Sequence, residues 1–343
     1  MSIRIGLVGG GNISNTHARA ASVIPGVEIV AVHGTNQEKV SRLSREFGAQ
    51  PYTDFKSFLA HSPMEVVIIG SPSGLHAEQG IAAAQRKLHV LTEKPIDITT
   101  DQADALISAC KRAGVKLGVI FQDRFKSDIL RLKNFLDAGS LGRILLVDAR
   151  VKWYRPPEYY RDSKWRGTLA LDGGGALMNQ GIHTVDLLIW LFGDVVRVQA
   201  RTATLLHEIE SEDTALAVLE FANGAMGTLQ ATTAAYPGYA RRLEITGSEG
   251  TVILEQDRIV GADLRNKREL LVRAETGDQN PSASSPVVSD IRGHRQAIED
   301  FIHSIETNGT PVCDGEDGRR SLALVEAIYE SAGFHRKSMQ RAI

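Results

Sequence analysis

Cysteine is scarce in this chain of 343 residues, which has only Cys110 and Cys313. Neither has a second cysteine or a histidine at metal-ligand spacing, so the sequence predicts no disulfide framework and no metal site. Neither has a nearby base in the sequence that would activate a thiol, and both are expected to be inert. This cysteine usage fits a reducing compartment, and we expect a cytoplasmic protein.

A surplus of charge of one sign is also missing. The chain has 39 Lys and Arg against 41 Asp and Glu, a net charge of −2, and no cluster of basic residues that would neutralise nucleic-acid phosphates. The longest apolar runs, such as 66–69, fall far short of the about 18 residues of a membrane helix. The N-terminus shows no hydrophobic export signal. We therefore expect a soluble protein without nucleic-acid or membrane partners.

The composition that remains is that of a globular protein, with 43% apolar and 23% charged residues. At about 150 residues per domain, the length predicts two domains. The first third alternates short apolar runs with segments of helical period, which is typical of parallel strands joined by crossover helices. We predict strands at 3–8, 27–32, 66–69, 89–91 and 116–119, and helices at 15–24, 37–47, 75–85 and 100–113. The fold class is α/β, with a doubly wound parallel sheet of the Rossmann type.

The pattern changes after about Arg124, where strand follows strand. A helix is predicted at 127–138, and Asn223-Gly224 is a hairpin signal within a mainly antiparallel open sheet. The predicted strands are 144–151, 195–204, 214–221, 225–232, 241–246 and 251–254. A surface loop at 275–290 precedes helices at 291–307 and 319–333. We predict a Rossmann domain over 1–123 and an α+β domain for substrate binding and oligomerisation over 124–335.

A glycine-rich turn follows the first strand. It reads Gly9-Gly10-Gly11-Asn12-Ile13-Ser14 and lies between a strand and a helix, the context that dinucleotide binding requires. Gly9 permits the tight turn, Gly11 lets backbone N–H groups approach a pyrophosphate, and the helix N-terminus favours negative charge. The predicted contacts are Gly9, Gly11, Asn12 and Ile13.

The second strand lacks the acidic residue that usually holds the adenosine ribose. It ends in His33-Gly34-Thr35-Asn36, and no arginine follows immediately to bind a 2′-phosphate. The choice between NAD and NADP is therefore open at this point. Gly34, Thr35 and Asn36 are predicted to lie at the cofactor; Thr35 and Asn36 could equally cap the helix that starts near Gln37.

Two further strands end in polar segments that should face the same crevice. One is Ser71-Pro72-Ser73-Gly74-Leu75-His76, and the other is Thr92-Glu93-Lys94-Pro95. A lysine in a partly desolvated cleft exchanges protons near neutral pH, and Pro95 restricts the backbone of Lys94. A solvated surface lysine is the alternative. We predict cofactor contacts from Ser71, Pro72, His76, Glu93 and Lys94.

A second polar group follows Gly173-Gly174-Gly175. Asn179 and His183 are four residues apart and are expected to share a helix face, with Asp186 close to that face. An amide and an imidazole placed together could hold a hydroxyl group and take its proton, whereas a histidine satisfied within the core is the competing interpretation. No third ligand accompanies His183 and Asp186, so metal binding is not predicted.

Together these motifs, in this order and spacing from residue 1 to about 335, resemble the glucose–fructose oxidoreductase and inositol dehydrogenase (Gfo/Idh/MocA) family. The resemblance implies a Rossmann domain, an α+β domain whose open sheet forms an oligomer interface, and a nicotinamide cofactor, NAD or NADP. It implies sugars, cyclitols or their derivatives as substrates. A homodimer or homotetramer is expected.

The resemblance also assigns roles to residues. Lys94 resembles the family's lysine that contacts the reacting hydroxyl, and His183 its general acid/base, while a cis peptide is implied for Lys94-Pro95. Asn179 stands where many members have Asp, and an amide cannot raise the basicity of a neighbour as a carboxylate would. The catalytic set is Lys94, His183 and Asn179. Gln122, Trp165 and Arg166 resemble cofactor contacts, and Arg124 lies at the family's domain junction.

The expected reaction is hydride transfer between nicotinamide and a secondary hydroxyl or ketone of a sugar. One alternative is a keto-sugar reductase with Lys94 as the proton donor, and another is a dinucleotide-binding sensor without turnover. The aromatic and basic segment 153–161, which includes Tyr154, is expected to project from the second domain near the cleft. It could stack on a sugar, hold a phosphate or contact another subunit, and Tyr236 could line the pocket or merely pack. The substrate set is Lys94, Tyr154, Asn179, His183 and Tyr236.

Overall fold

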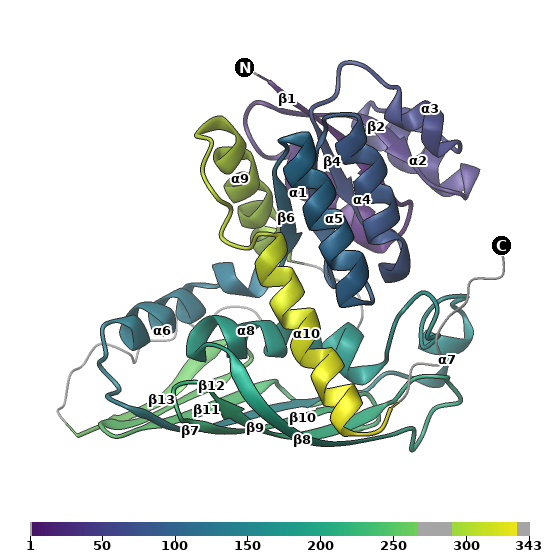
Figure 1. Ribbon diagram of the computed structural model, residues 1–343. Coiled ribbons are helices and arrows are strands. Elements are labelled where there is room, and N and C mark those ends of the chain that lie inside the picture. Colours follow the sequence, from purple (N-terminus) through teal and green to yellow (C-terminus); the bar gives the residue numbers. More distant parts are fainter. Residues whose placement is uncertain (1, 266–289, 335–343) are drawn as a thin grey trace. The chain divides into compact units, whose positions relative to one another are not determined.

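The computed structural model describes residues 2–265 and 290–334 (Figure 1). Contacts between Cα atoms divide these residues into two compact units. The first holds the chain through Gln122 together with the stretch from Asp290 to Leu322, and the second begins at Asp123 and also takes the chain from Ala323. The loop predicted at 275–290 lies, apart from Asp290, outside the described residues.

The first unit contains a six-stranded parallel sheet in the order β3-β2-β1-β4-β5-β6. The strand order reverses between β1 and β4, which is the switch point at which dinucleotides bind in such sheets. Its strands are β1 (Ile3–Val8), β2 (Val27–His33), β3 (Gln50–Tyr52), β4 (Val66–Ile69), β5 (His89–Glu93) and β6 (Leu117–Ile120). The predicted doubly wound α/β fold is confirmed.

Helices cover both faces of this sheet, so β4 and β6 are buried at every position. They are α1 (Asn12–Ser22), α2 (Gln37–Phe47), α3 (Phe55–Leu59), η1 (Ser73–Leu75), α4 (His76–Gln85) and α5 (Thr100–Ala113). Helices α2 and α5 have the predicted bounds, and each ends at a glycine in left-handed conformation, Gly48 and Gly114. The short elements β3 and α3 were not predicted, since three and five residues carry little periodicity.

Two later helices contribute to the first unit, although residues 124–335 were predicted to form the second domain. Helix α9 (Arg292–Glu306) packs on α1, and its Phe301 ring lies against Gly118 so closely that a Cβ at 118 would come within 2.7 Å of the ring. The start of α10 (Gly315–Ser331) pairs Arg319 with Asp104 of α5. These contacts join residues that are far apart in the sequence. Hydrophobic periodicity is a local signal and does not predict them.

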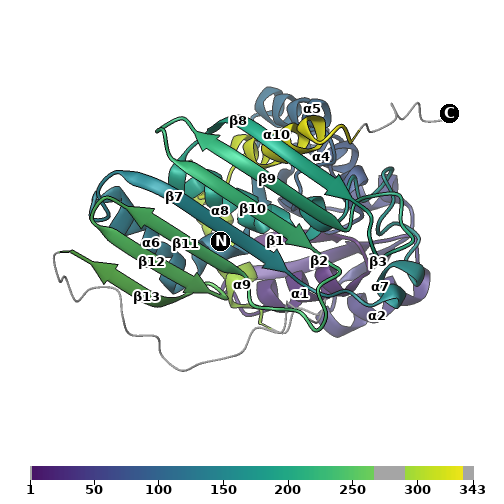
Figure 2. The ribbon, with the colours of Figure 1, turned by 90° about the horizontal axis from the view of Figure 1, so that it is seen from below.

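The second unit contains a seven-stranded sheet in the order β13-β12-β11-β7-β10-β9-β8 (Figure 2). Every neighbouring pair is antiparallel except β7 and β10. Its strands are β7 (Ile144–Lys152), β8 (Val195–Ala203), β9 (Thr214–Phe221), β10 (Met226–Thr232), β11 (Arg242–Gly247), β12 (Gly250–Glu255) and β13 (Arg258–Leu264). The mainly antiparallel sheet is confirmed; β13 was not predicted.

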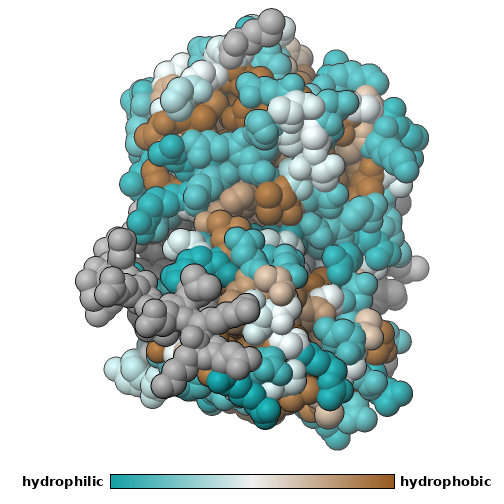
Figure 3. Space-filling model, turned by 90° about the vertical axis from the view of Figure 1, so that its left-hand side faces the viewer, coloured by the Kyte–Doolittle hydropathy of each residue, from teal (hydrophilic) through white to brown (hydrophobic). Residues whose placement is uncertain are grey.

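One face of this second sheet is covered by helices, whereas the other carries none among the described residues (Figures 1 and 2). The helical elements of this unit are η2 (Gln122–Phe125), which begins at the last residue of the first unit, α6 (Ser127–Asp137), α7 (Pro157–Arg161), η3 (Ala176–Gly181) and α8 (Ile182–Phe192). Five large apolar side chains of this sheet are 46–57% exposed, namely Leu146, Leu216, Val218, Met226 and, on the edge strand β13, Val260. On the face drawn in Figure 3, by contrast, hydrophobic residues occur in small groups among hydrophilic ones.

In the described part of the chain, no helix combines the length and the apolar character needed to span a bilayer.

Candidate active site

The glycine-rich turn forms a cradle at the carboxyl end of β1. Gly9 has φ +122°, and a Cβ there would lie 2.6 Å from the Gly70 carbonyl oxygen, so only glycine fits. A Cβ on Gly11 would meet nothing within 4 Å, and no side chain caps the N-terminus of α1 at Gly11. The first N–H groups of α1 therefore face open space, as a pyrophosphate site requires.

Six buried polar side-chain atoms of the first unit lack hydrogen-bond partners among the described residues. Two of them are Ser14 Oγ on α1, beside Gly9 of the glycine-rich turn, and Gln122 Oε1 just after β6. Buried polar atoms are normally satisfied, so atoms left without partners mark places where a polar ligand can bind. Together with the open cradle at Gly11, these atoms show that the first unit fits a dinucleotide.

The end of β2 explains why the acidic residue is absent. A Cβ on Gly34 would lie 2.9 Å from Val40 and 3.3 Å from the backbone nitrogen of Gly10, so a larger residue would press against the glycine-rich turn. Asn36 caps α2, because its Oδ1 accepts from the Lys39 backbone N–H at 3.0 Å. Thr35 and Asn36 are both exposed and therefore accessible to a ligand, although Asn36 also caps the helix.

The loops after β4 and β5 are fixed to each other by His76. Its ring is buried, with Nδ1 at 2.8 Å from the Pro95 carbonyl oxygen and Nε2 at 3.0 Å from that of Ser71. The Ser71 hydroxyl donates to Gln79 Oε1 at 2.6 Å. Lys94 is half-buried, and its peptide bond to Pro95 is cis, as the resemblance implied. His76 thus holds the loop that carries Lys94.

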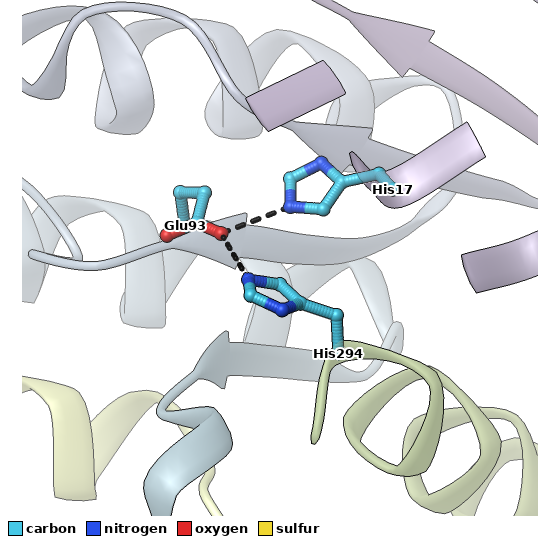
Figure 4. A group of neighbouring side chains, drawn as sticks. All are labelled: His17, Glu93 and His294. Atoms are coloured by element: carbon cyan, nitrogen blue, oxygen red, sulfur yellow. Dashed lines mark hydrogen bonds and ion pairs between the residues drawn. The ribbon is translucent and has the colours of Figure 1, made fainter. Parts of the chain in front are cut away.

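Glu93, directly before Lys94, lies in a buried group with His17 and His294 (Figure 4). Its Oε1 is 2.9 Å from His17 Nε2 and 3.6 Å from His294 Nε2, while Oε2 accepts from the Lys94 backbone N–H at 3.1 Å. Burial alone would raise the pKa of Glu93, but hydrogen bonds from the two imidazoles hold it well below its usual value. Burial lowers the pKa of His17. An ionised Glu93 therefore links α1, α9 and the Lys94 loop.

These three side chains are of metal-ligating types, but their arrangement fits hydrogen bonding better. Both Nε2 atoms approach the same carboxylate oxygen. A metal-bound histidine normally donates its other ring N–H to a neighbouring acceptor. In His17 and His294 the other ring nitrogen, Nδ1, has no hydrogen-bond partner among the described residues, so the group lacks this feature of a metal site.

In the second unit, Asn179 lies in a π-helical turn rather than in an α-helix. The turn η3 carries Asn179, and His183 follows in α8, so the α-helical spacing of four does not describe this pair. Asn179 Nδ2 donates to Asp172 Oδ1 at 2.7 Å, and Asp172 is buried. A carboxylate therefore lies beside the amide at 179, although residue 179 itself carries none.

The start of η3 is anchored by Glu212. This buried carboxylate accepts from the backbone N–H groups of Gly175 and Leu177 at 2.9 and 2.7 Å and from the Tyr329 hydroxyl at 2.9 Å. Burial raises its pKa to about 7 despite these donors. A Cβ on Gly175 would overlap the Glu212 backbone oxygen, which accounts for one glycine of the triple-glycine segment. Glu212 was not predicted from the sequence, because no local motif surrounds it.

His183 is buried on α8, with Nδ1 at 3.8 Å from Asp123 Oδ2. Asp123 is also paired with Lys126 at 2.6 Å and with Arg241 at 2.7 Å. Burial would raise the pKa of Asp123, but Arg241 and Lys126 hold it well below its usual range. Asp123 was not predicted from the sequence, because its partner Arg241 is remote in the chain.

Asp186 does not join His183 at the candidate site. It forms a two-pronged ion pair with Arg124, with distances of 2.9 and 2.7 Å, and both side chains are 1% exposed. The Arg124 guanidinium also lies over the Trp190 ring, 5.3 Å from its centre. These two residues stabilise the interior of the second unit.

Tyr154 and Tyr236 lie together, with ring centres 5.2 Å apart and edge to face. Tyr236 is 77% exposed. The expectation that segment 153–161 projects is wrong in part, because Trp153, Arg155 and Tyr160 are buried. The segment packs inward at Arg155, because its guanidinium lies over the Trp153 ring and donates to Gln180 Oε1 at 3.2 Å.

The predicted pair Trp165 and Arg166 lies on the same side of the unit as Tyr159. The Arg166 guanidinium lies over the Tyr159 ring at 4.3 Å and over the Trp165 ring at 5.4 Å. Arg166 Nε has no hydrogen-bond partner among the described residues. The pair therefore presents a cation framed by aromatic rings.

Similarity to solved structures extends over nearly the whole chain. The WlbA dehydrogenase from Bordetella pertussis, in complex with NADH and UDP-GlcNAcA, is 36% identical, with a TM-score of 0.86 and 97% of each chain covered. The WlbA dehydrogenase from Chromobacterium violaceum, in complex with the same two ligands, is 32% identical, with a TM-score of 0.86. The match covers 97% of this chain and 94% of the other. Myo-inositol 2-dehydrogenase from Thermotoga maritima is 26% identical over 96% of each chain.

Two family models match the two halves of the chain. Residues 3–121 match the oxidoreductase family with an NAD-binding Rossmann fold, and residues 129–253 match the GFO/IDH/MocA C-terminal domain. Both matches agree with the sheets described above, one parallel and one mainly antiparallel. The chain belongs to the Gfo/Idh/MocA family of NAD-binding oxidoreductases, and it is an NAD(P)-dependent dehydrogenase acting on CH–OH groups.

Proposed function

We propose that the protein is an NAD-dependent dehydrogenase that oxidises a secondary hydroxyl of a UDP-linked sugar acid. One observation carries this proposal: the chain is 36% identical, over 97% of both chains, to a dehydrogenase crystallised with NADH and UDP-GlcNAcA. The relatives that act on free cyclitols are more distant in sequence, as the 26% identity to myo-inositol 2-dehydrogenase illustrates. The substrate class is therefore taken from the more similar relative.

NAD is the proposed cofactor rather than NADP. Thr35 and Asn36 offer a hydroxyl and an amide to ribose hydroxyls, and no arginine follows Gly34 immediately to bind a 2′-phosphate. The open N-terminus of α1, Ser14 Oγ and Gln122 Oε1 would hold polar groups of the dinucleotide. When bound, NAD supplies the acceptor for the hydride.

The chain's own residues would manage the proton and the charge. His183 takes the proton of the reacting hydroxyl as general base, and Lys94 hydrogen-bonds the same oxygen and stabilises its developing negative charge. Asn179, held by Asp172 at 2.7 Å, presents its amide oxygen to a substrate hydroxyl. The π-helical turn and the Glu212 anchor fix the backbone that carries Asn179.

The aromatic pair Tyr154 and Tyr236 is proposed to contact the substrate. Tyr236 is largely exposed, and its ring is braced edge-to-face by Tyr154, which leaves a face available for stacking on an apolar sugar or base surface. Trp165 and Arg166 are proposed as cofactor contacts, since Arg166 Nε has no hydrogen-bond partner among the described residues.

The test is nicotinamide reduction by the purified protein with NAD⁺ and NADP⁺ in parallel. The substrates are UDP-GlcNAcA, the matching UDP sugar without the carboxylate, the free sugar acid and myo-inositol. We expect turnover with UDP-GlcNAcA and NAD⁺ and much slower turnover with the other three substrates. Equal or faster turnover with myo-inositol or with the free sugar acid would contradict the assignment to a UDP-linked sugar acid.

We further propose that the bare face of the second sheet is a contact between copies of this chain in a homodimer or homotetramer. Leu146 and Met226 are directly paired across β7 and β10, and Leu216 and Val218 are two residues apart on neighbouring β9, so all four can form one apolar surface. Burying a charge in such a contact is strongly unfavourable.

The double variant Val218→Lys/Met226→Lys should therefore dissociate the oligomer, which light scattering coupled to gel filtration measures as a lower molar mass. Val23→Lys/Val312→Lys, at two residues of the first unit that are 50% and 39% exposed, introduces the same two charges away from the second sheet and should leave the mass unchanged. An unchanged mass in the double variant would exclude this face as the contact.

A further inference from the structure

Asp123 belongs to a buried network of two carboxylates and two cations in the second unit. Lys126 Nζ lies 2.6 Å from Asp123 and 2.5 Å from Asp257, and Arg241 bridges the same two carboxylates. Asp123, Arg241 and Asp257 have side chains that are 6–8% exposed. The formal charges cancel, so the network can be buried without a net charge.

His183 is the titratable group that this network faces. Its Nδ1 lies 3.8 Å from Asp123 Oδ2, the oxygen that also accepts from Arg241. Among the charged groups of neighbouring elements, Asp186 on α8 is paired with Arg124, and Asp172 is bonded to Asn179. Asp123 comes from η2, Lys126 from the residue before α6, Arg241 from the residue before β11, and Asp257 from the turn between β12 and β13.

An ionised carboxylate beside Nδ1 has two effects on an imidazole. It favours the tautomer with the proton on Nδ1, so that Nε2, at the other edge of the ring, has the lone pair that can accept a proton. It also stabilises the imidazolium that forms when the proton is accepted, which makes His183 a stronger base. The 3.8 Å between Nδ1 and Oδ2 is an ion-pair distance and too long for a hydrogen bond, so Asp123 acts on the ring through its charge.

We propose that Asp123 is the positioning residue of His183: it sets the tautomer of the ring and raises its basicity, and it supplies the carboxylate that residue 179 lacks. The proposal rests on the proposed function, in which His183 is the general base. Lys126 and Arg241 keep Asp123 ionised, while their own positive charges oppose its effect on the ring. The basicity of His183 is thus set by a balance within one buried network.

The test measures the pKa of His183 by histidine-selective NMR in Asp123→Asn, Lys126→Met and Asp257→Asn. A fourth variant, His183→Asn, identifies the His183 signals. In Asp123→Asn, loss of the anion should lower the pKa of His183 by about one unit. In Lys126→Met, loss of a cation should raise that pKa. Lys126 is 31% exposed, so this variant is the one most readily accommodated by the fold. The nitrogen chemical shifts of neutral His183 should show the proton on Nδ1 in the wild-type protein.

Asp257→Asn is the matched control, because it removes a carboxylate from the same network without touching His183. The His183 pKa should fall by much less in Asp257→Asn than in Asp123→Asn, because only Asp123 lies within ion-pair distance of the ring. An equal shift in Asp123→Asn and Asp257→Asn, no shift in either direction, or a proton on Nε2 in the wild-type protein would each overturn the proposal. If Asp123→Asn does not fold, the upward shift in Lys126→Met decides the question.

Enzyme kinetics give the second readout. For substrate oxidation the base must be unprotonated, so the acid limb of the kcat/KM profile should move to lower pH in Asp123→Asn, and the plateau should fall about tenfold. The limb should move to higher pH in Lys126→Met. The NMR titration needs no substrate, so a wrong substrate assignment would abolish turnover while leaving the histidine result intact.

Discussion

Replacing Lys94 with methionine should lower kcat by about 10²- to 10⁴-fold, the range of a positioned proton-transfer or charge-stabilising group. Methionine is unbranched like lysine but cannot donate a hydrogen bond or carry a charge. The loop around residue 94 should keep its form, because it is fixed by contacts that do not involve the lysine ammonium. These are the His76 bridge between the Ser71 and Pro95 carbonyls and the Glu93 contact to the backbone N–H.

The measurement is single-turnover and steady-state oxidation, with NADH binding followed by fluorescence. Lys87→Met is the matched control, since Lys87 is exposed in the loop before β5 and its ammonium donates to the Ala113 carbonyl oxygen at 2.9 Å. We expect NADH affinity to be unchanged in both variants and kcat to fall only in Lys94→Met. A kcat near that of the wild-type protein would remove Lys94 from the reaction.

A double variant tests whether Lys94 and His183 act on the same oxygen. Groups that act as a unit in one transition state show strongly non-additive effects. If His183→Asn alone causes a comparable loss, Lys94→Met/His183→Asn should be much less impaired than the product of the two single losses. Multiplicative losses would indicate independent roles.

Most elements of the first unit could be predicted from the sequence, because they are bounded by local signals. Residues 3–8, 37–47, 66–69 and 100–113 form the predicted elements with the predicted bounds, and glycines in left-handed conformation end two of the helices. The glycine-rich turn is equally local, since the positive φ of Gly9 and its contact with Gly70 leave no room for another residue. Signals of this kind lie within a few residues of each other and need no knowledge of the tertiary fold.

The carboxylates around the candidate catalytic residues could not be predicted in this way. Asp172 meets Asn179 across a π-helical turn, and Asp123 meets Arg241 from a position 118 residues earlier in the sequence. Neither contact follows a helical or strand period. Asn179 itself carries no negative charge. Tertiary packing supplies carboxylates from two other positions, because Asp172 lies beside Asn179 and Asp123 lies beside His183.

The second large effect expected is on stability, in the buried pair of Arg124 and Asp186. Asp186→Leu should lower the free energy of unfolding by about 3–5 kcal/mol, because it leaves the Arg124 charge buried without its carboxylate. The pair is two-pronged and 1% exposed, so water cannot replace the lost partner. Urea unfolding followed by tryptophan fluorescence measures this change, and Trp190 under the Arg124 guanidinium places a reporter at the site.

The cause of that loss can be separated from simple cavity or packing effects. Arg124→Met/Asp186→Leu removes both charges, so it should regain a large part of the stability lost in Asp186→Leu, since the penalty comes from the unpaired charge rather than from the missing ion pair. Asp137→Asn is the control. It breaks the surface pair with Lys133, whose partner carboxylate is 57% exposed, and it should change the free energy of unfolding by about 0.5 kcal/mol or less. A double variant as unstable as Asp186→Leu would show instead that Arg124 stabilises the second unit through its other contacts, such as the one with Trp190.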